Sequence, residues 1–324
     1  MNRALKIALQ VAVSAGIIAY LLWQIDVGRT VDLIVASNPA YLLAALAIFL
    51  VTTGGMAWRW QILLASKGIR EPLGWLTRLY FIGYAAGQIL PTGIGGDAVR
   101  ILEHARRRPT ARGEAAGAVL MERMLGATGT LMLVAVGLIV AAGRYNDIAV
   151  LVWLEVAFVI GVFLAALLLF SRRAHRLLQE RVFPRARRIR LDRALASVWA
   201  ALHGYRDQPA ALTAVVAITI CMQAARIIAI WFCGEAVGLN VSPLVYVILG
   251  PLLFLIMLVP FTINGLGVRE AFFVAFLGRF DVGANAAFAT GFLFYAVTIA
   301  SSVPGGLILL WRSLRPAFVR PREG

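Results

Sequence analysis

The sequence is poor in charged residues. Only 15% of its 324 residues are charged, whereas 61% are apolar and the mean hydropathy is +0.83. Ordinary soluble domains carry about 25% charged residues, so this chain cannot cover a water-facing surface in the usual way. The composition excludes a soluble globular domain and predicts a polytopic membrane protein.

Cysteine and histidine are also scarce. The two cysteines, Cys221 and Cys233, lie in one apolar segment, too far apart along a helix to form a disulfide. His104, His175 and His203 stand apart from one another, without a Cys/His cluster at metal-ligand spacing. We therefore expect no metal and no cofactor. The phosphate-binding pattern Gly-x-x-x-x-Gly-Lys-[Ser/Thr] is missing too, which argues against ATP-driven activity by this chain alone.

Arginine is abundant, and the net charge is +15. In a soluble protein this charge would suggest nucleic acid, but here the arginines cluster between apolar segments, as the positive-inside rule describes. We expect no nucleic-acid partner. The most basic segment, residues 171–209, is predicted to be a cytoplasmic loop, and apolar positions at helical spacing predict an amphipathic helix on the anionic membrane surface within it.

Six apolar runs approach or exceed the roughly 20 residues that a membrane-spanning helix requires. They cover about residues 7–23, 41–64, 115–142, 148–170, 210–232 and 284–311. Basic residues before the first run and after the last place both chain termini in the cytoplasm. The expected fold is an all-α polytopic membrane protein.

Two further apolar segments, about residues 79–105 and 244–280, are interrupted by proline and glycine and are predicted to be re-entrant helical hairpins. Basic residues on both sides of the first hairpin indicate that it enters from the cytoplasm and returns there. The number of remaining spans then places both ends of the second hairpin outside. The chain therefore divides into two inverted-topology repeats, residues 1–142 and 143–324, each with three spans and one hairpin, an arrangement that favours a transport site between the repeats.

The two hairpins share a motif of ten residues. Pro91–Arg100 and Pro260–Arg269 coincide at five of ten positions. Irregular backbone at membrane depth must be buried by protein or lined by water. We expect the glycines to permit turns and close backbone approach without needing to touch a ligand. The predicted turn residues are Pro91, Gly93, Gly95, Gly96, Pro260, Gly265 and Gly267.

Two arginines lie inside apolar spans at corresponding places, Arg59 before Pro91 and Arg226 before Pro260. An intramembrane charge costs about 2.5–3.5 kcal/mol even on insertion scales, so a functional role with a nearby partner is the default interpretation. Arg59 lies between two tryptophans, and the alternative is that it extends to the membrane interface. The same alternative applies less well to Arg226, which lies deeper.

The remaining candidate ligands lie in or beside the two motifs. Arg100 and Arg269 are the best of them, because hairpin turns and helix N-termini bind anions, although both arginines could instead satisfy backbone carbonyls. Glu122 and Arg123 point about 100° apart on a helix and must meet different partners, either substrate or a locking ion pair. Asp97 could cap a helix. Glu270 could neutralise Arg269 or carry a proton, and Asn264 completes the set.

Arginine binds phosphate bidentately, so a cationic cleft suits a phosphate-bearing amphiphile whose tails stay in lipid. We expect the substrate-binding residues to be Arg59, Asp97, Arg100, Glu122, Arg123, Arg226, Asn264, Arg269 and Glu270.

The motifs resemble those of a known family. The sequence Pro-x-x-x-Gly-Gly-Asp-x-x-Arg ending at Arg100, the pair Glu122–Arg123, Trp-Arg-Trp around Arg59 and Asn-Gly-Leu-Gly-Val-Arg-Glu ending at Glu270 are similar to the flippase-like family that includes the membrane part of lysylphosphatidylglycerol synthases. The resemblance implies a bacterial or archaeal inner-membrane protein that translocates or handles modified phospholipids or polyprenyl-linked intermediates. It also implies that aminoacyl transfer belongs to a following soluble domain, so we expect this chain not to be an enzyme.

Two other interpretations stay open. An integral-membrane enzyme could use the same arginines to hold a pyrophosphate, with Asp97, Glu122 or Glu270 as a base. Alternatively, the chain is an accessory subunit of lipid or cell-envelope glycan biosynthesis, whose basic loop binds a cytoplasmic synthase or glycosyltransferase.

Overall fold

The computed structural model describes residues 3–90, 95–141, 160–161, 164, 202–258 and 265–314, and their regular secondary structure is entirely helical. The long helices are α1 (Arg3–Gln24), α3 (Pro39–Ala65), α6 (Arg112–Ala141), α11 (Pro209–Ala236) and α14 (Ala284–Leu314). The shorter ones are α2 (Val27–Val35), α4 (Leu73–Ile89), α5 (Gly95–Arg107), α12 (Pro243–Leu258) and α13 (Val268–Leu277), with 3₁₀ turns at Pro109–Ala111 and Gly278–Phe280.

Four segments among the described residues are long and apolar enough to cross a membrane: Pro39–Ala65, Pro109–Gly137, Pro209–Ala236 and Ala284–Leu314. A fifth is present if Gln10–Gln24 and Val27–Val35, which are bent by 93°, form one span. The all-α polytopic membrane fold is thereby confirmed. Most of the predicted span 148–170 and most of the basic loop 171–209 lie outside the described residues. The placement of the termini stays a prediction.

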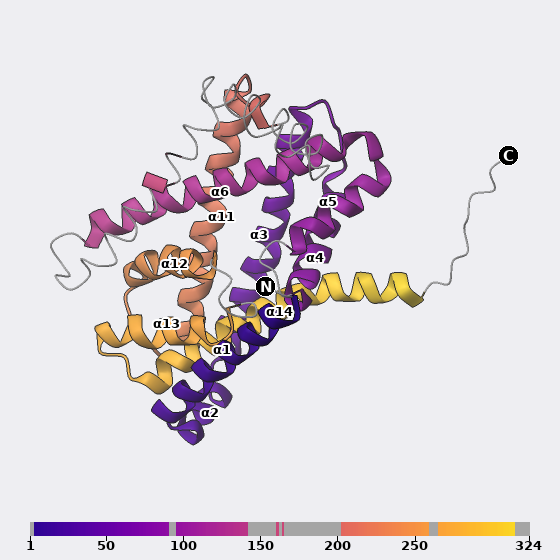
Figure 1. Cartoon of the computed structure of the whole chain (residues 1–324). Coiled ribbons are helices and arrows are strands. Elements are labelled where there is room, and N and C mark those ends of the chain that lie inside the picture. The colour runs from indigo at the N-terminus through magenta and orange to yellow at the C-terminus, as the bar shows by residue number, and fades with distance from the viewer. Residues whose placement is uncertain are drawn as a thin grey trace.

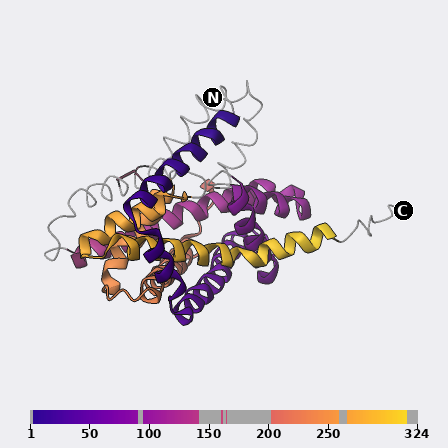
Figure 2. The same ribbon diagram turned by 90° about the horizontal axis from the view of Figure 1, so that it is seen from below.

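Local sequence signals fix several helix starts. Asn38 caps α3, its side-chain oxygen accepting from the Ala40 N–H at 3.0 Å, and Pro39 follows at the first helical position. Asp26 caps α2 in the same way through the Arg29 N–H. The Asp26 N–H also donates to Asn285 Oδ1 at 3.0 Å, which ties the corner between α1 and α2 to the start of α14. Figure 2 shows α1 extending from this corner toward the N-terminus.

Helices α4, α5, α12 and α13 have 17, 13, 16 and 10 residues, fewer than the roughly 20 that a full span requires. In the first pair, a Cβ on Gly96 would collide with the backbone oxygen of Gly83, so glycine is needed where α5 crosses α4. In the second, Gly265 and Gly267 have φ of +74° and +85°, which favours glycine. Pro91, Gly93 and Pro260 lie outside the described residues, and re-entry stays a prediction.

The helices contact one another in a reciprocal pattern when α3, α4, α5 and α6 are matched with α11, α12, α13 and α14. Helix α14 packs on α4 as α6 packs on α12, and α5 packs on α6 as α13 packs on α14. Helices α3 and α11 lie side by side in the middle of Figure 1 and make the most extensive contact. Two halves related by an approximate twofold axis would produce this pattern. The inverted orientation of the halves stays a prediction.

Two apolar clusters form the interior. One gathers around Tyr246, Leu249, Phe273 and Phe276, from α12 and α13, against α11 and α14. The other gathers around Trp60, Leu63 and Leu79, from α3 and α4, against α6. The charged residues discussed next lie where α3, α4, α5, α6 and α11 meet, so apolar packing holds them away from water.

Candidate functional site

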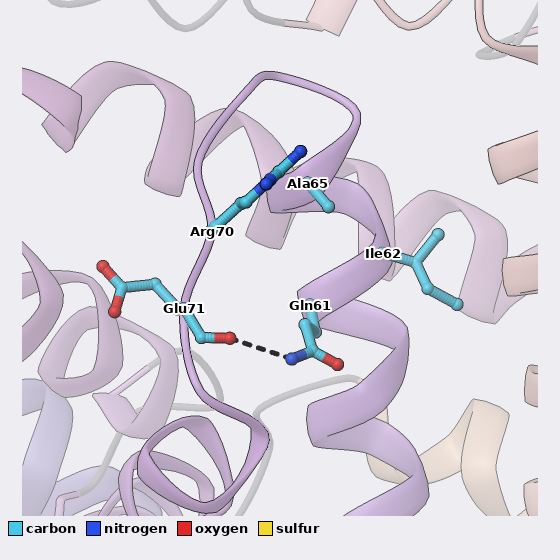
Figure 3. Close-up of a pocket in the computed structure, with 5 residues that line it drawn as sticks. All are labelled: Gln61, Ile62, Ala65, Arg70 and Glu71. Carbon is cyan, nitrogen blue, oxygen red and sulfur yellow. Dashed lines mark hydrogen bonds between the residues drawn. The ribbon is translucent and has the colours of Figure 1, made fainter.

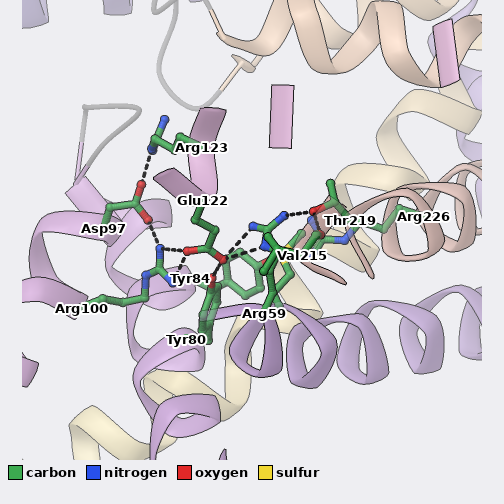
Figure 4. Close-up of polar contacts among 11 residues, drawn as sticks. Arg59, Tyr80, Tyr84, Asp97, Arg100, Glu122, Arg123, Val215, Thr219 and Arg226 are labelled. Carbon is green, nitrogen blue, oxygen red and sulfur yellow. Dashed lines mark hydrogen bonds and ion pairs between the residues drawn. The ribbon is translucent and has the colours of Figure 1, made fainter. Parts of the chain in front are cut away.

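Glu122 of α6 lies at the centre of a buried ion-pair network (Figure 4). Its Oε1 accepts from Nε and Nη2 of Arg59 on α3, at 3.0 and 2.7 Å, and from the hydroxyl of Tyr80 on α4. Its Oε2 accepts from Nη1 and Nη2 of Arg100 on α5, both at 3.3 Å. Glu122 is only 2% exposed, so the network is shielded from bulk water.

Arg59 points into the protein. It is 7% exposed, whereas its neighbour Trp58 is 49% exposed and lies on the outer face of α3. Besides Glu122, Arg59 Nη1 donates to Thr219 Oγ1 of α11 at 2.9 Å. These contacts do not fit the alternative that Arg59 extends to the membrane interface.

Asp97 extends the network outward. Its Oδ1 accepts from Arg100 Nη2 at 2.7 Å, and its Oδ2 accepts from Nε of Arg123, whose side chain is 39% exposed. Glu122 and Arg123 thus meet different partners, as expected from their divergent directions on α6. Arg100 also lies 3.8 Å above the ring centre of Tyr80, a cation–π contact that holds its guanidinium plane in place.

Arg226 of α11 is half-buried beside this network but has neutral partners. Its Nε donates to Thr52 Oγ1 at 3.3 Å, its Nη2 donates to the Tyr84 hydroxyl, and its guanidinium lies 5.2 Å from the ring centre of Phe49. Within the described part of the chain, no carboxylate lies within ion-pair distance of it.

The contacts of Arg59 and Arg226 are related. Arg59 on α3 donates to Thr219 on α11, and Arg226 on α11 donates to Thr52 on α3. Both arginines, and both threonines, are separated by the same 167 residues. The two arginines differ in their ion pairs. Arg59 pairs with Glu122, and Arg226 has no carboxylate partner among the described residues.

Six charged residues from the contacts above make up what we call the central cluster. It contains four arginines and two carboxylates, so its formal charge is +2. Its members are Arg59, Asp97, Arg100, Glu122, Arg123 and Arg226.

Arg269 and Glu270 form a separate, compensated pair at the start of α13. Glu270 Oε1 accepts from Nε and Nη2 of Arg269 at 3.1 and 3.0 Å, and its Oε2 accepts from the Gly267 N–H at 2.8 Å. The Arg269 guanidinium lies 4.1 Å from the ring centre of Tyr295. Both charged residues are buried, and the bond from the Gly267 N–H joins the pair to the turn that precedes α13. Asn264, the other candidate from this motif, lies outside the described residues.

Sequence reasoning missed the neutral members of the site, Tyr80, Tyr84, Thr52 and Thr219. The two tyrosines are four positions apart and therefore share a face of α4, which is a signal that periodicity could have supplied. The two threonines carry no comparable signal in an apolar helix. Each is buried and also donates back to its own helix, so their role as acceptors for arginine appears only when α3 and α11 meet.

A third buried carboxylate, Glu71, joins the loop after α3 to the end of α5. Its oxygen lies 2.7 Å from Arg108 Nε and 3.8 Å from His104 Nε2. Its backbone oxygen accepts from Gln61 Nε2 at 2.8 Å beside a cavity of about 340 Å³ (Figure 3). The cavity is lined by Gln61, Ile62, Ala65, Arg70 and Glu71, none of which belongs to the central cluster.

In the described part of the chain, no group of three or more His, Cys, Asp or Glu side chains comes together to form a metal-ligand set. Cys221 and Cys233 are both free thiols.

Comparison with protein-family models shows to which family the chain belongs. The family model for the lysylphosphatidylglycerol synthase TM region matches residues 7–307. The chain belongs to this family. A search of curated proteins returned no match. Membership agrees with the resemblance carried by the motifs around Arg59, Arg100, Glu122 and Glu270, and makes the chain a multi-pass membrane protein with a lipid-related role.

The expectation that the chain is not an enzyme is wrong. The family is that of the transmembrane region of lysylphosphatidylglycerol synthases, which are enzymes, and the match covers that region. The error has a physical origin. Apolar helices show that a chain lies in lipid, but they do not show whether that membrane region is part of an enzyme. A bacterial inner-membrane location stays a prediction.

Proposed function

We propose that the central cluster binds the phosphate of an anionic lipid and passes it between the two leaflets. The observation that carries this proposal is Arg226, a half-buried cation beside the ion-pair network whose partners in the described structure are neutral. A charge in this environment is costly unless an anion neutralises it. A lipid phosphate would supply that anion.

Phosphate suits the arrangement better than a carboxylate or a neutral headgroup. Guanidinium groups bind phosphate through two parallel N–H bonds, and the hydroxyls of Tyr84 and Thr52 could turn to donate to its other oxygens. Arg123, at the exposed end of the network, offers a first contact for a headgroup arriving from outside the cluster. The acyl or prenyl tails would stay in the bilayer, so only the polar head needs a path through the protein.

Two lipid classes fit this chemistry, anionic phospholipids and polyprenyl phosphates. Both present a phosphate attached to apolar chains, and the cluster recognises the phosphate. A leaflet-transfer assay with one labelled lipid of each class, matched against a zwitterionic lipid of the same tail length, separates them.

The test is reconstitution into liposomes that contain head-labelled lipid, with quenching from outside. We expect the full chain to expose more labelled anionic lipid than protein-free liposomes do, and Arg226→Gln to slow this transfer by at least about tenfold, because a charged hydrogen-bonding partner is lost. Arg29→Gln, which removes an exposed arginine of α2, is the matched control and should transfer at the wild-type rate. Transfer by Arg226→Gln at the wild-type rate would refute the proposal.

The family description favours a second role, in lipid synthesis. As the membrane region of a synthase system, the same cluster would hold the lipid phosphate while a cytoplasmic synthase acts on the headgroup. This role requires lipid binding but no transfer between leaflets. An Arg226-dependent binding signal without leaflet transfer would therefore favour the synthetic role over translocation.

A further inference from the structure

Glu122 occupies the position that a bound phosphate would take between Arg59 and Arg100. It accepts two N–H bonds from each guanidinium and one O–H bond from Tyr80. The same donors, on three different helices, would suit a phosphate, which has three or more oxygens available to accept them. Because Glu122 is 2% exposed, a phosphate cannot bind both arginines while this carboxylate remains between them.

A displaced Glu122 would have few other cations with which to form an ion pair. Arg123, its neighbour on α6, is already paired with Asp97. Arg226 on α11 does not pair with Glu122 in the described structure, and the proposed function assigns its charge to the lipid phosphate. A carboxylate that loses its counter-charges in a water-excluded site is destabilised relative to its protonated form. Proton uptake removes this penalty.

We propose that a lipid phosphate displaces Glu122 from Arg59 and Arg100, and that the released carboxylate takes up one proton from water. This inference rests on the proposed function and adds a coupling to it. An O–H bond forms on Glu122 as the phosphate binds. When the phosphate leaves, the proton returns to water and the carboxylate rebinds the arginines. One proton therefore accompanies each anionic lipid, and the net charge of the cluster stays constant.

The charged and titratable groups around Glu122 identify Asp97 as the competing proton acceptor. Arg59 faces Glu122 from α3, Tyr80 from α4 and Arg100 from α5, and Asp97 lies on the far side of Arg100. If Arg100 turns toward a phosphate, Asp97 keeps its ion pair with Arg123 and its 21% side-chain exposure. Glu122 keeps neither, so the proton goes to Glu122.

The test is calorimetric titration of the detergent-purified full chain with short-chain phosphatidylglycerol, in two buffers of different ionisation enthalpy at the same neutral pH. The difference between the two heats gives the number of protons taken up per lipid bound, which we expect to be about one for the wild type. Glu122→Gln, which mimics the protonated side chain, should bind the lipid with no proton uptake. The control Glu103→Gln, which lies outside the central cluster and whose arginine partners are exposed, should take up protons as the wild type does.

Two results would overturn the inference: lipid binding without proton uptake in the wild type, or uptake that persists in Glu122→Gln. If Glu122→Gln fails to fold, infrared difference spectra of the wild type serve instead. A new protonated-carboxyl band on lipid binding supports the inference, and no new band overturns it. Leaflet transfer without proton uptake would leave the proposed function standing, whereas proton-coupled binding without transfer would refute translocation and leave this inference intact.

Discussion

Replacing Glu122 with alanine is expected to destabilise the protein by about 3–5 kcal/mol, the usual cost of removing one partner from a buried ion pair. The change leaves Arg59 and Arg100, which are 7% and 4% exposed, without their shared carboxylate. Arg59 would keep only Thr219, and Arg100 would keep Asp97. Glu122→Gln keeps an oxygen between the arginines and should cost less.

Glu103→Ala is the matched control for Glu122→Ala. Glu103 also pairs with two arginines, Arg106 and Arg312, at 2.7 and 2.8 Å, but the arginine side chains are 78% and 39% exposed and Glu103 itself is 18% exposed, against 2% for Glu122. Exposed pairs contribute about 0–1 kcal/mol, so its loss should hardly change stability. Chemical unfolding of the purified variants measures both effects. Equal losses for Glu103→Ala and Glu122→Ala would show that burial of the network does not determine its strength.

The second large effect is expected from Gly305→Ala, at the crossing of α14 and α4. A Cβ at this position would overlap the backbone oxygen of Phe81 and lie 3.0 Å from the Ile82 nitrogen. Because the obstacle is backbone, it cannot rotate away as a flexible side chain would, and the two helices must move apart. Overpacking usually costs about 1–3 kcal/mol, and a clash with backbone should reach or exceed the upper end of that range.

Gly306→Ala provides the control for this clash. A Cβ on Gly306 would meet no heavy atom within 4 Å, so this variant should be at least as stable as the wild type, since alanine favours a helix over glycine by about 1 kcal/mol. The yield of folded protein on size exclusion and its unfolding midpoint distinguish the two variants. Similar behaviour of Gly305→Ala and Gly306→Ala would contradict the close packing of α14 on α4.

The sequence predicts the long helices well. Apolar runs at 41–64, 115–142, 210–232 and 284–311 match α3, α6, α11 and α14 to within a few residues, because burial of a helix in lipid leaves a nearly continuous apolar pattern. The arrangement of these helices is harder to predict. The approach of α14 to α4 depends on Gly305, and in a sequence with 30 glycines no local pattern singles this one out.

For the site, sequence reasoning found the charged residues but not their pairing. An intramembrane charge is conspicuous, so Arg59, Glu122 and Arg226 are easily recognised. Their partners come from helices far apart in the chain, and the choice of Glu122 as the shared acceptor of Arg59 and Arg100 depends on how α3, α5 and α6 meet. Likewise, the shared motif suggests equal roles for Arg100 and Arg269. In the structure, Arg269 pairs with its neighbour Glu270, whereas Arg100 belongs to the central cluster.

Arg59 and Arg226 differ in their partners. Arg59 on α3 pairs with the carboxylate of Glu122, whereas the described partners of Arg226 on α11 are the neutral hydroxyls of Thr52 and Tyr84. A cluster in which a carboxylate paired with every arginine would serve only to hold the helices together. Arg226 has no carboxylate partner among the described residues, which is why the proposed function depends on this residue more than on Arg100 or Arg269.

The most direct measurement is a charge exchange between α11 and α3, followed by leaflet transfer of anionic and zwitterionic lipid. Arg226→Thr removes the uncompensated charge, and the double variant Thr52→Arg/Arg226→Thr returns it to the same place from the opposite helix, as Arg59 and Thr219 already do in the other direction. We expect the single variant to lose the preference for anionic lipid and the double variant to regain it. Wild-type transfer and selectivity in Arg226→Thr would contradict a phosphate-binding role for the central cluster.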